Sequence, residues 1–151
     1  MKRLLENESI ETGNIYFTDL SDSKVFLSDF KGKPILLLRS TQKSAKESPQ
    51  WGKALNSIYD SGSITFLNVA FVEKEPPASI KASVKNQLKR GYGKVPFLID
   101  WNKSTGLATP GHDDYTHVFL IDPQGYLRLE YAEKYSGSAL EELVELINKN
   151  V

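Results

Sequence analysis

Short apolar stretches separated by turn-forming residues occupy the first third of the chain. Residues 15–18 and 24–27 are rich in β-branched, aromatic and other apolar side chains, and they flank the turn-rich segment 19–23. This pattern predicts a β-hairpin. After a loop over 29–34, the uninterrupted apolar run 35–38 predicts a strand that is buried on both faces, as in the centre of an α/β sheet.

The middle of the chain changes to helical spacing. From residue 51, apolar side chains recur at i, i+4, i+7 and i+8, which predicts an amphipathic helix from Pro49 to about Gly62. A second buried strand is predicted over 64–72. Another helix then follows and ends at Gly91, and its apolar positions are Ile80, Val84 and Leu88.

The last third contains a short strand, a long loop and a second hairpin. Residues 95–99 predict the strand, whose proline favours its start or an edge of the sheet. The loop 101–114 is rich in Gly, Thr, Asn and Asp and has no periodicity. Residues 117–121 and 126–131 surround a Pro-Gln-Gly turn, which predicts the hairpin.

The final helix begins at a capping box, with Ser138 as N-cap and Glu141 at N3. In chain order the predicted elements are β-β, β-α-β, α, β, β-β and α. A right-handed β-α-β unit joined to a hairpin and a closing helix predicts one mixed sheet with helices on both faces, an α/β fold of the thioredoxin type. We expect one domain over 13–151, with the first predicted hairpin as an N-terminal addition, and a polar segment over 1–12.

The composition excludes several classes of partner. The 19 basic side chains balance the 19 acidic ones, so nothing points to nucleic acid or to an anionic membrane. No run of about 18 apolar residues is present, which excludes a membrane-spanning helix. Residues 1–7 have the charges of a signal peptide but lack its apolar stretch. We expect a cytoplasmic protein if the chain is complete, and a periplasmic or otherwise extracytoplasmic one if a signal segment was removed.

Two phrases of the sequence resemble the redoxin group of the thioredoxin superfamily. Residues 17–37, from Phe-Thr-Asp-Leu to Gly-Lys-Pro-Ile-Leu-Leu, are similar to that group's N-terminal hairpin and first core strand. Residues 119–127, Phe-Leu-Ile-Asp-Pro-Gln-Gly-Tyr-Leu, are similar to its late hairpin. The resemblance covers residues 13–151 and implies a thioredoxin-like fold, with a central mixed sheet flanked by helices.

The redoxin group carries its redox motif between the first core strand and the first helix. In this chain Ser44, Ser48 and Pro49 have the spacing of the Cys-x-x-x-Cys-Pro motif of the Sco/SenC-like copper proteins. Residues 44–47 are also similar to the YtfJ group, in which this loop lacks a cysteine pair. The Cys-x-x-Cys motif of the thiol-disulfide oxidoreductases of cytochrome maturation fits the spacing less well.

The chain contains no cysteine, so the dithiol chemistry of the group is absent from it. A serine hydroxyl has no redox couple and is a poor ligand for Cu(I). We expect Ser44 and Ser48 to cap the following helix instead, where a hydroxyl that accepts an N–H bond contributes about 1 kcal/mol. The other interpretation is a vestigial or engineered redox site.

Metal and hydrolase sites find little support in the sequence. Sco-like proteins add a histidine ligand just before the late strand, where this chain has Asp114, although His112 and His117 are close by. We therefore expect no metal and no cofactor. A Ser-His hydrolase is not favoured either, because the Gly-x-Ser-x-Gly elbow is missing.

The loop before the late strand is the predicted contact surface for a partner. The resemblance implies that Trp101 and Tyr115 lie in a loop beside the serine motif and contact a partner polypeptide, together with Pro49. It also places Thr116 where the group has a cis-proline.

Two functions remain open on the sequence. One is a non-catalytic protein that binds a protein partner near the Ser44 and Thr116 loops. The other is a thiol-disulfide oxidoreductase or Sco-like copper-delivery protein whose cysteines are replaced by Ser44 and Ser48. The sequence leaves open whether the protein is an enzyme.

Overall fold

The computed structural model describes residues 1–5, 10–72, 77–92, 97–101, 107 and 111–151. The start of the strand expected at Val95 and Pro96, and most of the expected loop 101–114, lie outside these residues. The helices are α1 (Ser48–Ile58), α2 (Ala78–Tyr92), α3 (Gly137–Asn150) and the short 3₁₀ helix η1 (Leu27–Phe30). The strands are β1 (Lys2–Leu4), β2 (Ile10–Glu11), β3 (Tyr16–Thr18), β4 (Lys24–Phe26), β5 (Ile35–Ser40), β6 (Thr65–Val72), β7 (Phe97–Trp101), β8 (His117–Ile121) and β9 (Tyr126–Tyr131).

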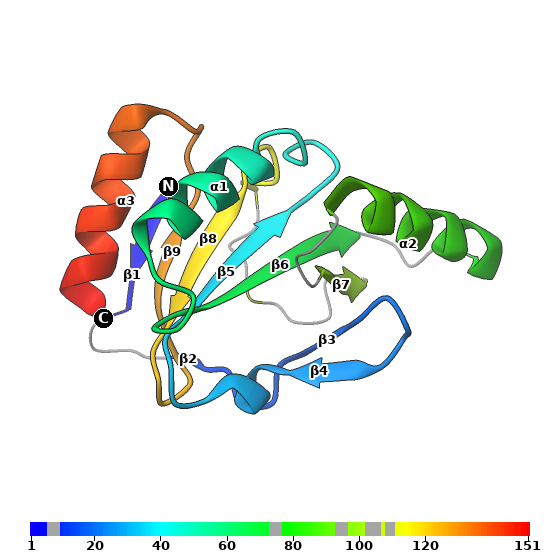
Figure 1. Ribbon diagram of the computed structural model, residues 1–151, viewed down its shortest axis with the longest axis horizontal. Coiled ribbons are helices and arrows are strands. Elements are labelled where there is room, and N and C mark those ends of the chain that lie inside the picture. Colours follow the sequence, from blue (N-terminus) through cyan, green and yellow to red (C-terminus); the bar gives the residue numbers. More distant parts are fainter. Residues whose placement is uncertain (6–9, 73–76, 93–96, 102–106, 108–110) are drawn as a thin grey trace.

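All nine strands of the described part belong to one mixed sheet with the order β1-β9-β8-β5-β6-β7-β3-β4, and β2 also pairs with β9 (Figure 1). Strand β5 lies in the middle, parallel to β6 and antiparallel to β8. All six of its residues are buried, as the uninterrupted apolar run 35–38 predicts for a central strand. The two predicted hairpins are confirmed as β3–β4 and β8–β9.

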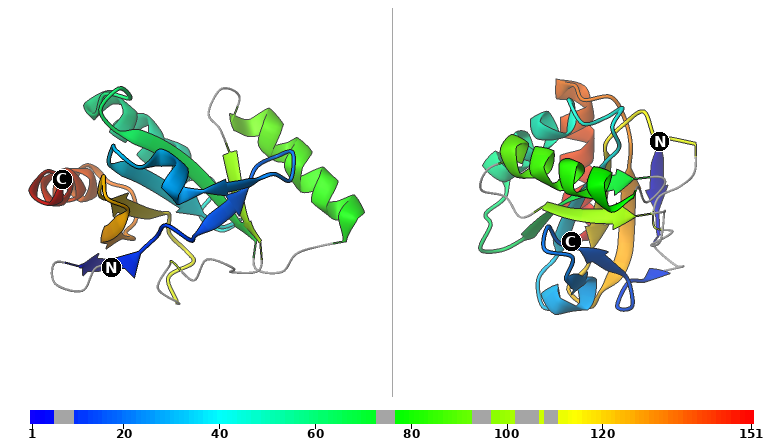
Figure 2. Two further views of the ribbon diagram at one scale, coloured as in Figure 1. Left: turned by 90° about the horizontal axis from the view of Figure 1, so that it is seen from below. Right: turned by 90° about the vertical axis from the view of Figure 1, so that its right-hand side faces the viewer.

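The expectation of helices on both faces of the sheet is wrong for the described residues. Helices α1 and α3 pack against the face that contains Leu36 and Leu38 of β5. The core on the other face, which contains Ile35 and Leu37, draws its buried side chains from strands, η1 and residue 107, with no α-helix among them. The left view of Figure 2 shows α1 on one side of the sheet and the segment that leads into β8 on the other.

Chain topology explains this one-sided arrangement. The connections β5–α1–β6 and β6–α2–β7 step in the same direction along the sheet. Right-handed crossovers of this kind place their helices on the same face. In the described part, the opposite face is covered by the β3–β4 hairpin, η1 and Leu107.

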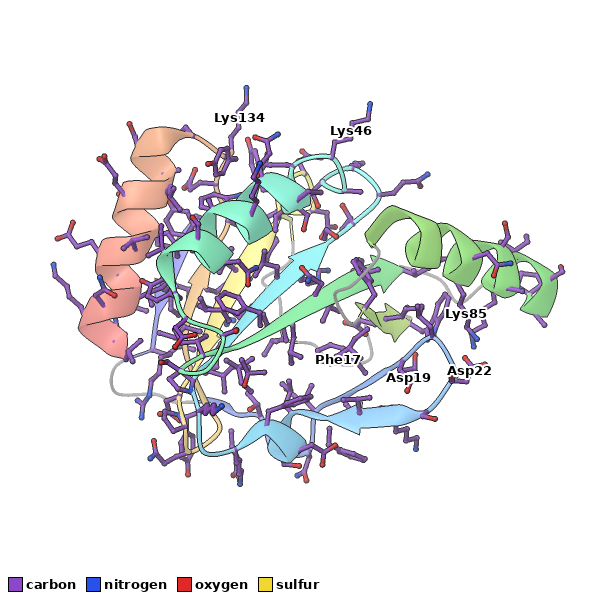
Figure 3. The ribbon with its side chains drawn as sticks, in the orientation of Figure 1. Phe17, Asp19, Asp22, Lys46, Lys85 and Lys134 are labelled. Carbon is purple, nitrogen blue, oxygen red and sulfur yellow. The ribbon has the colours of Figure 1, made fainter. Side chains whose placement is uncertain are left out.

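The β3–β4 hairpin is tied to α2 at its tip. Asp19 Oδ1 accepts bonds from the N–H groups of Ser21 and Ser23, which closes the turn. Lys85 of α2 points toward Asp22, and its Nζ lies 2.5 Å from Asp22 Oδ1 (Figure 3). The hydrogen bond to Lys85 lowers the pKa of Asp22.

The last helix and the N-terminal segment differ in detail from the sequence-based expectation. The N-cap of α3 is Ser136, whose Oγ accepts from the Ala139 N–H at 3.0 Å, so the assignment of Ser138 is wrong by two residues. Both serines precede the same apolar stripe, and only Ser136 has the extended backbone that an N-cap requires. The sequence pattern predicts no strand before residue 15, yet β1 and β2 both pair with β9.

No helix in the described part of the chain combines the length and the apolar character needed to cross a membrane.

The packing of α1 depends on one tryptophan. Trp51 is fully buried, its ring meets the rings of Tyr131 and Tyr135 edge to face, and its Nε1 donates to Glu47 Oε1 at 3.0 Å. We expect Trp51→Ala to lower the free energy of unfolding by about 3–5 kcal/mol, because it removes the ring and leaves a cavity. Chemical denaturation measures this loss. The matched control is Ile58→Ala in the same helix, where Ile58 is 47% exposed; similar losses in both variants would contradict the central role of Trp51.

Candidate functional site

The turn after β5 contains the two serines of the predicted motif. Ser44 and Ser48 are 1% and 5% exposed. Ser44 Oγ accepts from the Thr41 N–H at 2.9 Å, and the Ser44 carbonyl accepts from the N–H groups of Glu47 and Ser48 at 3.0 and 3.1 Å. Ser44 therefore organises the turn that leads into α1.

The expectation that Ser44 and Ser48 cap α1 is wrong. The N-cap position is Glu47, which makes no side-chain cap bond, and Ser48 and Pro49 are the first helical residues. The backbone carbonyls of Ser44 and Glu47 accept the first N–H groups of the helix, so no side-chain cap is needed. Lys46 in the same turn is exposed and points away from the molecule (Figure 3).

The segment before β8 lies against this turn. Thr116 is fully buried, and its Oγ1 donates to the Ser44 carbonyl at 3.5 Å, a long bond. Thr41 Oγ1 donates to the Asp113 carbonyl at 2.7 Å. No peptide bond among the described residues is cis. The structure thus brings Thr116 and Ser44 together through hydrogen bonds.

The two aromatic residues of the predicted contact surface differ in exposure. Tyr115 is 37% exposed and lies beside Thr116 in sequence. Trp101 is the last residue of β7, is only 7% exposed and has Lys81 Nζ 4.8 Å from its ring centroid. The expectation that Trp101 lies in a loop is therefore wrong, because the strand continues to it. Pro49, at the start of α1, is exposed.

A row of buried charged and polar side chains crosses the sheet beneath these loops, and sequence reasoning missed it. His117 and Glu130 are both fully buried, with 2.7 Å between His117 Nδ1 and Glu130 Oε2. Arg39 is 6% exposed and lies opposite His117 in the β5–β8 register. The available signal is the presence of charged or polar residues, Arg39, His117 and Glu130, in three largely apolar strands.

Arg39 is the cation at the centre of this row. Its guanidinium lies 3.9 Å from the centroid of the Phe71 ring, and its Nη2 lies 3.6 Å from Asp113 Oδ1. Burial lowers the pKa of Arg39, an effect that nearby Asp113, Asp100 and Glu130 oppose. An arginine stays protonated under such conditions, so the buried row keeps a positive charge next to the Ser44 turn.

Neither a hydrolase nor a metal centre is assembled by the described residues. Ser44 Oγ bonds with Thr41, and both ring nitrogens of His117 already face oxygen atoms. No hydrogen bond between a histidine and either serine hydroxyl occurs in the described ranges. Within those same ranges, no three His, Asp or Glu side chains gather closely enough to hold a metal ion.

Comparison with known proteins shows the fold. No protein-family model matches the sequence, and no curated protein matches it. Among solved structures, the chain is similar to a DsbF homologue from Corynebacterium diphtheriae, with 15% identity, a TM-score of 0.67 and coverage of 98% of this chain and 92% of that one.

Two further solved structures are similar over most of both chains. One is the exposed lipoprotein thioredoxin Etrx1 from Streptococcus pneumoniae, with 18% identity, a TM-score of 0.59 and coverage of 87% and 97%. The other is a secreted Mycobacterium tuberculosis disulfide oxidoreductase homologous to E. coli DsbE, with 13% identity, a TM-score of 0.57 and coverage of 89% and 95%. This protein therefore has a thioredoxin-like fold, shared with thiol-disulfide oxidoreductases, and it contains no cysteine.

Proposed function

We propose that this protein binds an extended polypeptide segment of a partner protein at the surface formed by the 41–49 turn and by Tyr115 and Thr116, and that it does so without thiol chemistry. The observation that carries this proposal is the contact between Thr116 Oγ1 and the Ser44 carbonyl. That contact holds the two segments side by side, and each of them carries an exposed side chain next to it in sequence or in the same turn, Tyr115 in one and Pro49 in the other.

The chemistry of this surface suits recognition of a polypeptide. Tyr115 is the large aromatic side chain of the surface, and partly exposed tyrosines are frequent anchors in protein interfaces. Lys43 and Asp114, each with 74% of the side chain exposed and 3.6 Å apart, join the two segments at the rim. Charges at such a rim affect association rate and partner choice more than affinity. Trp101 is left out of the proposed surface because only 7% of it is exposed.

Tyr115 provides the first test. A library of random linear peptides displayed on phage is selected against the purified protein, and the enriched peptide is synthesised as the probe. We expect Tyr115→Ala to weaken binding of that peptide by about tenfold or more, because truncation of an aromatic hot spot costs about 2 kcal/mol or more and a factor of ten corresponds to about 1.4 kcal/mol. Calorimetric titration gives the affinity.

The matched control for this test is Tyr16→Ala. Tyr16 has nearly the same exposure, 36%, but lies on β3 in the hairpin. We expect Tyr16→Ala to bind the selected peptide with the same affinity as the unchanged protein. If both variants bind equally well, or if no peptide is enriched, the proposed surface is wrong.

The second candidate function is a thiol-disulfide oxidoreductase or a Sco-like copper-delivery protein with both cysteines replaced. The observation that favours it is that Ser48 is the first residue of α1 and Ser44 lies in the turn that leads into it, close to a helix N-terminus that would stabilise a cysteine thiolate. The geometry is less favourable for a disulfide. The Ser48 N–H bonds to the Ser44 carbonyl as in a helical turn. Such residues have Cβ atoms about 5–6 Å apart, whereas a disulfide needs about 3.5–4.5 Å.

A variant with cysteine at both positions distinguishes the proposed binding function from a thiol or copper function. We expect the Ser44→Cys, Ser48→Cys variant to keep two free thiols in a glutathione buffer, because closing the disulfide requires the turn to move. Thiol titration and mass measurement after alkylation count the thiols, and each single variant is the control. A reversible disulfide with a defined potential, or tight Cu(I) binding that needs both cysteines, would favour the second function.

A further inference from the structure

We infer that Arg3, Glu130 and His117 form a clamp on the backbone of the segment before β8, and that this clamp positions Tyr115 and Thr116. The inference deepens the proposed function and rests on it, since it explains how the binding surface keeps its shape. The three residues are positioning residues, because none of them belongs to the proposed surface. We call the set the carbonyl clamp.

The carbonyl clamp connects two backbone carbonyls through side chains from three strands. At one end Arg3 Nη2 of β1 donates to the Leu107 carbonyl at 3.0 Å. Arg3 Nε lies 3.0 Å from Glu130 Oε1 of β9, an ion pair without an aligned hydrogen bond. Glu130 Oε2 lies 2.7 Å from His117 Nδ1. At the other end His117 Nε2 lies 2.7 Å from the His112 carbonyl.

The positions of the protons determine which group donates and which accepts in each contact of the carbonyl clamp. A carbonyl oxygen only accepts hydrogen bonds. Nε2 of His117 therefore carries a proton and donates a hydrogen bond to the His112 carbonyl. The 2.7 Å contact between Nδ1 and Glu130 Oε2 holds one more proton between the two groups. The His112 carbonyl and the Glu130 carboxylate are thereby both hydrogen-bonded. A buried polar group left without a partner there would cost stability.

The position of the carbonyl clamp relates it directly to the binding surface. His117 follows Thr116 in the chain, and its ring returns to the His112 carbonyl, which closes the segment 112–117 into a loop. Two further contacts hold the same segment, from Thr41 Oγ1 to the Asp113 carbonyl and from Arg39 to the Asp113 carboxylate. Tyr115 lies at the exposed part of this loop. The orientation of Tyr115 therefore depends on the bond between His117 and the His112 carbonyl.

General stability alone does not account for these residues. A buried ion pair is often no more stabilising than apolar side chains of similar volume, because both charges lose their hydration. On the opposite face of β8 the side chains are apolar, and Val118 and Leu120 pack in the core there. What the polar residues add, and what apolar ones lack, is a directed bond to a specific backbone carbonyl.

The test measures the loop by amide hydrogen exchange, which needs no partner, and the affinity of the selected peptide. We expect His117→Leu to raise exchange of the amides of residues 112–116 by about tenfold or more and to weaken peptide binding by a similar factor, because a directed bond to a charged pair is lost. His117→Gln keeps a side-chain amide that can donate a hydrogen bond, and we expect both effects to be smaller in it than in His117→Leu.

Val118→Ala is the matched control for a purely structural effect. Val118 is fully buried at the neighbouring position of β8, and its side chain belongs to the core on the opposite face of the sheet from His117. We expect this variant to lose global stability without selective exchange in 112–116. If His117→Leu fails to fold, Arg3→Met replaces it, since Arg3 lies at the sheet edge with 32% of its side chain exposed. Unchanged exchange in the clamp variants, or equal exchange in Val118→Ala, would overturn the inference.

Failure of the proposed function gives a different result. If no peptide binds the unchanged protein but His117→Leu selectively releases residues 112–116, the carbonyl clamp stands and the binding surface is wrong. If peptide binding depends on Tyr115 but not on His117, and exchange is unchanged, the binding surface stands and the carbonyl clamp is wrong.

Discussion

The burial of β5 on both faces is the constraint on which the rest of the structure depends. Its side chains alternate between two separate cores, with Ile35 and Leu37 on one face and Leu36 and Leu38 on the other. A strand in this position must find hydrogen-bond partners on both sides, and β6 and β8 provide them. Because β5 is parallel to β6 and antiparallel to β8, its carboxyl end lies where the chain before β8 returns. The turn with Ser44 and the segment with Thr116 meet there as a consequence.

The one-sided placement of α1 and α3 has an effect on the opposite face of the sheet. Where no α-helix of the described part covers the strands, the backbone of Leu107 and of residues 111–116 contacts the polar side chains of the sheet. An irregular segment cannot satisfy its own backbone groups as a helix does. Side chains from the strands beneath therefore bond to its carbonyls, and this requires polar residues at sheet positions that are otherwise apolar.

The elements with strong periodicity could be predicted from the sequence, and those that depend on long-range pairing could not. The apolar run of β5, the helical stripe of α1 and the two hairpins follow from local spacing. Strand β1 has the sequence Lys-Arg-Leu, which has no strand pattern of its own, and it forms because β9 offers a free edge. In the same way Arg39 and Glu130 look like exposed charges until the register places them next to His117.

The position of the serine turn between a strand and a helix could be predicted from the sequence, but its interactions could not. Ser44 and Ser48 lie between the first core strand and the first helix, as expected, whereas the capping role assigned to them failed because backbone carbonyls already satisfy the start of α1. Trp101 and Tyr115 both belong to a stretch without periodicity, so the sequence does not predict a difference in their exposure. Their difference arises because β7 extends to Trp101 and pairs it with Val72. A single sequence does not show where a strand ends when the decisive hydrogen bonds come from another strand.

The hydroxyl of Ser44 also bears on whether the serines stand in for cysteines. Its oxygen accepts the Thr41 N–H at 2.9 Å, inside a turn where only 1% of the residue is exposed. A thiol sulfur is a larger atom and a weaker acceptor, so a cysteine there would lengthen this bond in a tightly packed place. The same buried hydroxyl is unable to ionise usefully or to carry electrons. A turn organised around an oxygen acceptor fits a protein that binds with this surface better than one from which a reactive thiol has been removed.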